Sequence, residues 1–299
     1  MQRRSKIGVL GGDKRQLALC SLFAKKGFEC ALWGLDPADC TDLENTVKCV
    51  DWKCAVNGAD AVILPLPLTT DGVRLNCSRN TESTDIYIPR ITEIIQSLNR
   101  STILFAGKVP PNIRRFASEL GIKLTDYYES EEFQIKNAVP TAEGAIGIAI
   151  STLDITLADA ACAVVGYGRI GRTLASRLKA LGADVCCIAR SKKDLAWAVC
   201  DGCRTVKLNE YSSEKHCFDI IFNTAPHLIF NGDILKSMSR STVIVDLASH
   251  GCGVDTAEAE KNGIQHIKAL SLPGKSSPRT AGKIIFESIF EVLGEEGIL

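Results

Sequence analysis

Short apolar runs alternate with amphipathic stretches along the first 125 residues. The runs have the length of buried β-strands, and the stretches between them repeat apolar residues at helical spacing. We predict strands at residues 6–10, 29–33, 61–64, 101–105 and 122–124, and helices at 16–26, 88–98 and 112–120. Strands that alternate with helices indicate a parallel sheet covered on both faces. Residues 70–85 are rich in Thr, Asn, Ser and Asp and are predicted to form a mobile loop.

The second half of the chain repeats this alternation. Strands are predicted at residues 161–165, 184–189, 205–206, 219–222, 242–246 and 265–268, and a last amphipathic helix at 281–293. The fold class is therefore α/β, with two Rossmann-like, doubly wound domains that have parallel sheets and are separated by a cleft. We expect an N-terminal domain at 1–136, an interdomain helix at 137–158, a nucleotide-binding domain at 159–280, and a C-terminal helix at 281–299 that packs back on the first domain.

The interdomain helix is predicted to begin near Thr141. A threonine hydroxyl is a good N-cap, and Glu143 would then lie in the first turn, where a carboxylate matches the helix dipole. A helix N-terminus that faced the cleft would bind a substrate group, so Thr141 and Glu143 are candidate catalytic residues.

A dinucleotide fingerprint, Gly166-Tyr167-Gly168-Arg169-Ile170-Gly171, follows the apolar run at 161–165 and precedes an amphipathic stretch at 172–181. In this context the first glycine makes a tight turn, the second lets the backbone approach a pyrophosphate, and the third lets the helix pack on the strand. The alternative is a glycine-rich structural turn. The same loop at the start of the chain, Gly11-Gly12-Asp13, lacks the full fingerprint.

The residues after the second strand of this domain favour NADP over NAD. An acidic residue here would bind the ribose 2′-hydroxyl of NAD, whereas an arginine accommodates the 2′-phosphate of NADP. The chain has Arg190, Ser191 and Lys192 at this point. A guanidinium binds phosphate through two parallel hydrogen bonds, and a serine adds a third donor. The alternative is a solvated basic loop.

Three further segments leave strands at the edge where doubly wound sheets bind ligands. Asn223, Thr224 and Pro226 follow one strand, and Asp246, Ser249 and His250 follow the next. Lining the cofactor and taking part in catalysis are both open for Asn223, Thr224 and Asp246. His250 has a pKa suited to proton transfer, although a lone loop histidine is more often a polar surface residue. The Pro/Gly-rich stretch 269–281 is predicted to be a loop, and its Lys275 and Arg279 are candidates for binding substrate carboxylates. The alternative is a solvated basic loop. Ser249 and Thr280 are further candidates for binding the substrate.

Composition excludes several classes of protein. The 35 basic and 35 acidic side chains give no net charge, which argues against nucleic-acid binding. No apolar run reaches the roughly 18–20 residues of a membrane span, and the N-terminus lacks a secretory signal, so we expect a cytoplasmic protein. The 13 cysteines are scattered and mostly lie in apolar runs, as buried residues of a reduced protein do. A single Cys-x-x-Cys, at Cys200 and Cys203, does not predict a metal site.

Several segments together resemble one family, the A subunit of dipicolinate synthase from spore-forming bacteria. These segments run nearly from end to end in the same order: Gly11-Gly12-Asp13 with Arg15-Gln16, Asn137-Ala-Val-Pro-Thr-Ala-Glu-Gly-Ala145, Gly166–Gly171, Asn223-Thr-Ala-Pro226, Asp246-Leu-Ala-Ser249, and Leu272-Pro-Gly-Lys275 with Pro278 and Thr280-Ala-Gly282. The segment that begins at Asn137 is far more specific than the glycine fingerprint. One departure is Gly251-Cys252-Gly253, where the family usually has Pro-Gly-Gly.

The resemblance implies a reaction and a partner. A member of this family works with a flavoprotein-like B subunit, and the pair oxidises a dihydrodipicolinate-type intermediate of the lysine pathway to pyridine-2,6-dicarboxylate, with NADP as the acceptor. The two carboxylates of such a substrate would be met by cations, in agreement with Lys275 and Arg279. We also expect a homo-oligomer. The alternatives are an NADP enzyme that resembles shikimate or 2-hydroxyacid dehydrogenases, and a non-catalytic NADP-binding subunit of a complex.

Overall fold

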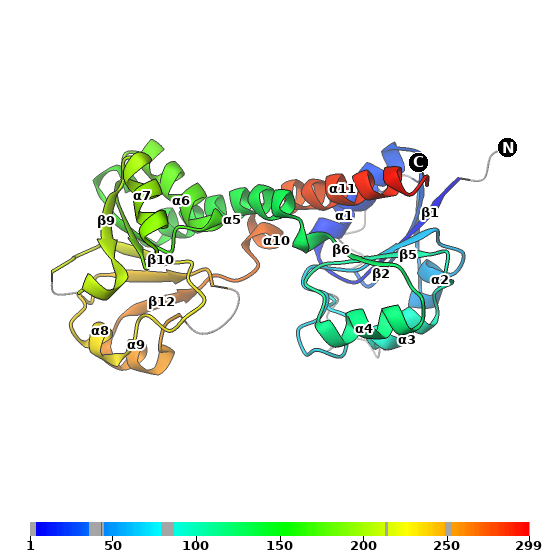
Figure 1. Cartoon of the computed structure of the whole chain (residues 1–299), viewed down its shortest axis with the longest axis horizontal. Coiled ribbons are helices and arrows are strands. Elements are labelled where there is room, and N and C mark those ends of the chain that lie inside the picture. Colours follow the sequence, from blue (N-terminus) through cyan, green and yellow to red (C-terminus); the bar gives the residue numbers. More distant parts are fainter. Residues whose placement is uncertain are drawn as a thin grey trace. The chain divides into compact units, whose positions relative to one another are not determined.

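The computed structural model describes residues 4–35, 43, 45–78, 87–212, 215–248 and 253–298 (Figure 1). The chain divides into two compact units. The first unit contains Met1–Lys136 and Ser277–Leu299, and the second contains Asn137–Ser276. The first unit is therefore built from both ends of the chain.

The first unit contains a parallel six-stranded sheet in the order β3–β2–β1–β4–β5–β6. Helices cover both of its faces, because each strand carries apolar side chains on alternating sides. One face packs against α1 (Lys14–Lys25) and α11 (Pro278–Glu295), and the other against α2 (Trp52–Val56), α3 (Ile91–Gln96) and α4 (Pro111–Glu119). The strands are β1 (Lys6–Leu10), β2 (Glu29–Trp33), β3 (Thr46–Lys48), β4 (Ala61–Ile63), β5 (Ile103–Ala106) and β6 (Leu124–Asp126).

Helix α11 lies alongside α1 in this unit, as Figure 1 shows for the red and blue helices. Its apolar side chains meet Phe23 of α1, whose ring lies 4.8 Å from that of Phe286. The two helices approach closely at Gly282, where a Cβ atom would lie only 2.4 Å from the carbonyl oxygen of Arg15. A glycine is thus required at this helix crossing.

The second unit repeats the topology, with the strands in the order β12–β11–β10–β7–β8–β9, all parallel. Numbered within its own unit, each sheet has the order 3-2-1-4-5-6 of a dinucleotide-binding fold. This confirms the predicted α/β class with two doubly wound parallel sheets. The strands are β7 (Ala161–Val165), β8 (Asp184–Ala189), β9 (Arg204–Lys207), β10 (Ile220–Asn223), β11 (Val243–Asp246) and β12 (Gln265–Lys268).

Helices also cover both faces of this second sheet. Side chains of α5 (Glu131–Thr152), α6 (Arg169–Ala180) and α7 (Lys192–Cys200) pack in one core cluster, and those of α8 (Gly232–Lys236) and α9 (Thr256–Asn262) in the other. Buried cysteines contribute to these cores as small apolar residues, and burial raises the pKa of Cys162 to about 12. Within the described ranges, no helix is both long and apolar enough to span a membrane.

Two predictions of local structure are wrong, and some elements were not predicted. The connecting helix is α5, which begins at Glu131, so Thr141 is not its N-cap and Glu143 is not in its first turn. The stretch 269–281 is not a loop, because α10 (Leu272–Ser276) and the start of α11 lie within it. Strand β3 and helix α2 were not predicted; β3 is a largely exposed three-residue edge strand, so no apolar run marks it.

Candidate functional site

The glycine turn between β7 and α6 has the backbone geometry of a phosphate-binding loop. Gly166 has a φ of +90°, and its N–H donates to the Ile188 carbonyl over 2.8 Å. A Cβ atom on Gly171 would lie 2.0 Å from the Gly166 carbonyl oxygen, so a side chain at this position would displace α6 from the turn. These two glycines set the turn and the close helix–strand packing.

Gly168 is the N-cap of α6 and has a different role. It supplies no side-chain cap, and a Cβ atom placed on it would meet no protein atom within 4 Å. The first N–H groups of a helix lack intrahelical partners and carry the positive end of the dipole. The turn therefore presents an open helix N-terminus, the arrangement that binds a pyrophosphate.

Thr224 holds the turn against the neighbouring strand. Its hydroxyl donates to the Val165 carbonyl over 2.9 Å, and its N–H donates to the same oxygen over 2.9 Å. The β7–β10 boundary, where Thr224 lies, is the point at which the strand order reverses, and doubly wound sheets bind their ligands at this point.

The other residues of the fingerprint face different surroundings. The Tyr167 side chain is buried under α6 and donates from its hydroxyl to Asp201 over 2.8 Å, so only its backbone is available to a nucleotide. Ile170 packs on the core of the unit. Arg169 is exposed in the first turn of α6.

At the carboxyl end of β8 the chain presents basic residues. Arg190 and Lys192 are exposed, and Ser191 caps α7 by accepting a hydrogen bond from the Asp194 N–H over 3.3 Å. The Ser191 oxygen is thus used by the helix, but the hydroxyl retains its own proton for an incoming acceptor.

The ends of β10 and β11 are joined by a buried hydrogen-bond network. The Asn223 amide donates to Asp246 Oδ1 over 2.9 Å, and the same oxygen accepts from the Ala248 N–H over 3.1 Å. Gly253 lies against this pair, and a Cβ atom there would lie 1.9 Å from Asn223 Nδ2. Asp246 is therefore a buried residue that fixes the loops after β10 and β11. Pro226 is exposed in the first of these loops.

His266 of β12 lies next to this network and was not singled out from the sequence. Its Nε2 lies 4.0 Å from Asp246 Oδ2 and has no hydrogen-bond partner among the described residues. Burial lowers the pKa of His266, while the Asp246 carboxylate opposes the shift and Lys268 adds to it. Alternation places His266 on the face of β12 opposite Ile267, but both faces of this sheet are covered, so alternation alone did not mark His266.

Thr141 and Glu143 lie in the interior of α5. The Thr141 hydroxyl donates back to the Asn137 carbonyl over 2.8 Å, the bond that a threonine makes inside a helix. The Glu143 carboxylate is exposed and lies 3.4 Å from Nε of Arg177 in α6. Neither side chain stands at a helix N-terminus, so the reason for naming them catalytic does not hold.

The predicted substrate-binding residues fall into three groups. Lys275 is exposed in α10 of the second unit, whereas Arg279 and Thr280 are exposed in the first turn of α11, in the first unit. Ser249 and His250 lie outside the described residues, as does most of the departing segment Gly251-Cys252-Gly253.

In the first unit, the glycine turn after β1 is covered by its own chain. The Gly12 N–H donates to the Asn76 carbonyl over 2.8 Å, and the Ser78 N–H donates to the Gly12 carbonyl over 2.9 Å. Asp13 caps α1 with its carboxylate, which also places a negative charge where a phosphate would lie. This turn differs from that of the second unit in both respects.

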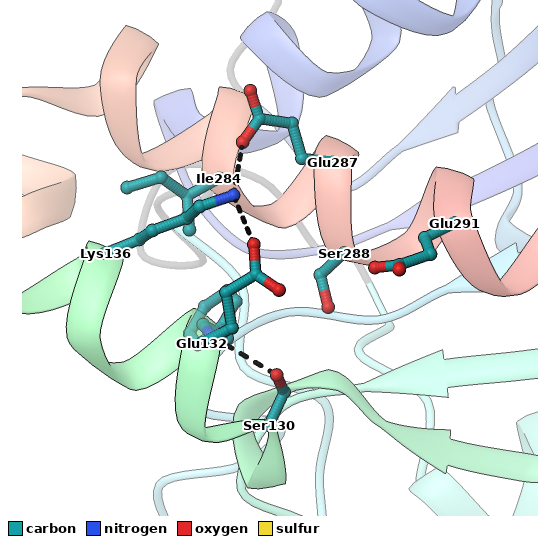
Figure 2. A pocket seen from close by; sticks show the side chains of 8 residues that line it. Ser130, Glu132, Lys136, Ile284, Glu287, Ser288 and Glu291 are labelled. Atoms are coloured by element: carbon teal, nitrogen blue, oxygen red, sulfur yellow. Dashed lines mark hydrogen bonds and ion pairs between the residues drawn. The ribbon is translucent and has the colours of Figure 1, made fainter.

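A separate cavity of about 270 Å³ lies in the first unit between the start of α5 and α11 (Figure 2). The Lys136 ammonium bridges Glu132 and Glu287 over 2.6 and 3.1 Å, and Glu291 also lines the space. These two hydrogen-bonded carboxylates raise the pKa of Lys136. With three carboxylates and one ammonium, the cavity is unsuited to a dicarboxylate.

Comparison with known proteins shows the family to which the chain belongs. It is 33% identical over 291 residues to the dipicolinate synthase A subunit of Bacillus subtilis (strain 168), covering 97% of this chain and 96% of that protein. The chain belongs to the family of dipicolinate synthase A subunits. The resemblance seen in the sequence is thereby confirmed. Residues 6–128 match the family model of the N-terminal domain of the dipicolinate synthase A subunit.

Solved structures agree with membership of this family. The A chain of dipicolinate synthase from Bacillus subtilis superposes with a TM-score of 0.82 and 32% identity, covering 99% of this chain and 97% of that one. The corresponding dipicolinate synthase chain from Bacillus halodurans gives a TM-score of 0.82 with 28% identity, covering 97% of each chain. A transhydrogenase from Sinorhizobium meliloti, at 14% identity and a TM-score of 0.67 over 96% of this chain and 92% of that one, shares the fold.

The second unit has its own relationship to dehydrogenases. Residues 144–261 match the family model of the D-isomer specific 2-hydroxyacid dehydrogenase NAD binding domain. The second unit is thus a dehydrogenase-type NAD-binding domain, and the glycine turn at Gly166 lies within it.

Proposed function

We propose that this chain, with a second subunit, oxidises a dihydrodipicolinate-type intermediate to pyridine-2,6-dicarboxylate, using NADP as acceptor. The observation that carries the proposal is the open N-terminus of α6 after Gly168, in a chain that is related over its whole length to a dipicolinate synthase subunit. Such a site binds a dinucleotide pyrophosphate.

The reaction transfers a hydride from the dihydropyridine ring to the nicotinamide of NADP and releases a proton, giving an aromatic product. Because aromatisation favours this direction, the chain's own residues need mainly to bind and orient the substrate. Asp246 is a positioning residue, because its buried carboxylate accepts hydrogen bonds from the Asn223 amide and the Ala248 N–H and so fixes the loops that would border the cofactor. His250 is our candidate for accepting the proton, and Ser249, Lys275, Arg279 and Thr280 are candidates for binding the substrate.

The test of the reaction is a combined assay. The freshly prepared condensation product of the lysine pathway is incubated with NADP, this chain and a candidate B subunit, and dipicolinate is followed by its ultraviolet absorbance. We expect dipicolinate only when both subunits are present. No product from the folded pair contradicts the proposal, and oxidation of 2-hydroxy acids by this chain alone would favour the dehydrogenase activity named in the second unit's family model.

The cofactor preference rests on Arg190, which is exposed directly after β8. Charge-assisted hydrogen bonds contribute about 1.5–3 kcal/mol, so Arg190→Ala is expected to weaken NADP binding roughly 10- to 100-fold and to leave NAD binding nearly unchanged. Titration calorimetry with both nucleotides measures this.

Arg240→Ala is the matched control for this variant. Arg240 is an equally exposed arginine, but it precedes β11 and so lies at the opposite edge of the same sheet. The control variant should bind both nucleotides as the wild type does. Equal affinities of the wild type for NADP and NAD would refute the preference.

A further inference from the structure

The carboxyl edge of the first unit's sheet is where a doubly wound fold binds a ligand. At the end of β1 this edge is covered, because residues 76–78 pair with the glycine turn. On one side of β1 the edge continues through the ends of β4, β5 and β6. Lys108 lies there, two residues beyond the end of β5.

The backbone of Lys108 is held in a conformation that side chains rarely adopt. Its φ is +57°, in the left-handed region, where a lysine persists only if its surroundings impose it. The buried carboxylate of Asp126 does so, accepting from the Lys108 N–H over 3.1 Å and from the Val109 N–H over 2.8 Å. The same carboxylate accepts from the Tyr128 N–H over 3.0 Å, which ties the end of β5 to the segment after β6.

The side chain of Lys108 is also fixed. It is half-buried, and its Nζ lies 4.9 Å from the centre of the Tyr128 ring, within the range of a cation–π interaction. Burial lowers the pKa of Lys108, and the Asp126 carboxylate partly offsets this. A partly desolvated ammonium attracts a carboxylate more strongly than one in bulk water does.

Two other cations near this edge have structural roles. The Arg15 guanidinium is buried and hydrogen-bonds both Asp13 oxygens and the Leu66 carbonyl, which holds the end of β4 against α1. Arg114 of α4 lies 2.8 Å from Glu129 and 3.5 Å from Asp126. The Lys108 ammonium lies against the face of the Tyr128 ring.

We propose that Lys108 binds a carboxylate of the substrate, with Tyr128 and Asp126 as the positioning residues that hold its amine and its backbone. This inference rests on the proposed function and adds a substrate-binding residue in the first unit to those considered above. It explains why a lysine occupies a left-handed position that a glycine would take without strain. A planar pyridine dicarboxylate supplies the anion that the amine would meet.

The experiment measures binding of the product, pyridine-2,6-dicarboxylate, to the full-length chain by titration calorimetry in the presence of NADP. Lys108→Gly removes the amine but suits the left-handed backbone. The relief of backbone strain opposes the loss of the cation–π contact and the higher entropy of glycine in the unfolded chain, so this variant should melt within a few degrees of the wild type. We expect this variant to bind the dicarboxylate roughly 10- to 100-fold more weakly, the range for a lost charge-assisted hydrogen bond. Its affinity for NADP should be unchanged.

Lys26→Met is the matched control. Lys26 makes a cation–π contact of the same kind, 5.3 Å from the Phe290 ring, but it lies at the C-terminus of α1, at the opposite edge of the sheet. This variant should bind the dicarboxylate normally. In the two-subunit assay, Lys108→Gly should raise KM for the substrate and change kcat less.

Two results would overturn the proposal: failure of the wild-type chain to bind the dicarboxylate, or equal binding by wild type and Lys108→Gly. The outcome is distinct from that of the combined assay. A chain that binds the dicarboxylate through Lys108, yet forms none of it with either nucleotide and both subunits, supports this site and contradicts the proposed reaction.

Discussion

At the scale of single residues, the three glycines of the fingerprint have separable tasks. A side chain at Gly171 would collide with the Gly166 carbonyl, whereas one at Gly168 would enter open space. The first collision is a packing conflict within the protein. The open space at Gly168 is where we propose that a pyrophosphate approaches the backbone.

Gly171→Ala and Gly168→Ala should therefore fail in different ways. Overpacking costs about 1–3 kcal/mol, so Gly171→Ala should lower the melting temperature of the second unit by roughly 3–10 °C. Gly168→Ala should melt as the wild type does and still lose most of its affinity for the dinucleotide. Calorimetric melting and nucleotide titration on both variants check this; a stable Gly168→Ala chain with normal nucleotide affinity would contradict the binding geometry.

His266 should make the stability of the second unit depend on pH. Its pKa is lowered below the usual 6.5 chiefly by burial, so the unfolded chain binds a proton that the folded chain does not. The stability that the folded chain has while His266 is neutral is fully present above pH 6.5, and it is lost as the pH falls below that value. Between pH 7.5 and pH 5.5, the melting temperature of the wild type should therefore decrease more than that of His266→Gln. An equal decrease in melting temperature in the two proteins would show that His266 is not the group responsible.

At the scale of elements, α5 shows what a residue pattern can conceal. Asn137–Ala145 contains a threonine followed two residues later by a glutamate, which in isolation is typical of a helix start. The helix instead begins at Glu131 and includes Pro140. Helix continuity here depends on packing, since Ala142, Ala145 and Ala149 are fully buried in the core of the second unit.

Thr141→Ala tests the position of this residue within α5. Loss of a true N-cap costs about 1 kcal/mol, whereas inside a helix the loss of one hydrogen bond is offset by the better helix propensity of alanine. Thr141→Ala should hence melt within about 2 °C of the wild type. Asp255→Ala is the contrast, because Asp255 caps α9 by accepting from the Glu258 N–H over 3.1 Å, and it should melt several degrees lower. A similar decrease in melting temperature in both variants would indicate that Thr141 caps a helix.

The sequence predicted those elements whose pattern is local. Strands β1, β2, β7 and β8 have the predicted bounds, because each is an apolar run closed by glycine or polar residues. Strand β12 also has the predicted bounds, although Ile267 is its one apolar residue. Contacts between distant residues left no such pattern. His266 is buried beside Asp246, 20 positions away, and the strained backbone of Lys108 is held by Asp126, 18 positions away. Both contacts depend on how the strands pair.

At the scale of the whole molecule, the chain path makes the two units unequal. The second unit is one continuous segment, Asn137–Ser276, with its own sheet and two core clusters. The first unit needs α11 from the far end of the chain. Helix α11 buries Ile285, Phe286, Ile289 and Leu293 on that unit's core, and each such side chain contributes about 1.5–3 kcal/mol.

A fragment of residues 137–276 is therefore expected to fold and to bind NADP within a few-fold of the full chain, since Gly166–Gly171, Arg190 and Asn223 all lie within it. It should not bind the dicarboxylate, because Lys108 is absent.

A chain that ends at Ser276 should retain nucleotide binding but lose the melting transition of the first unit. The side chains of α11 contribute roughly 6–12 kcal/mol, which matches the total stability of an ordinary domain, about 5–15 kcal/mol. Calorimetry and nucleotide titration on both proteins measure these effects. An unfolded 137–276 fragment would mean that the second unit depends on the first, and a first unit that still melts cooperatively without α11 would mean that its core is complete in the N-terminal segment alone.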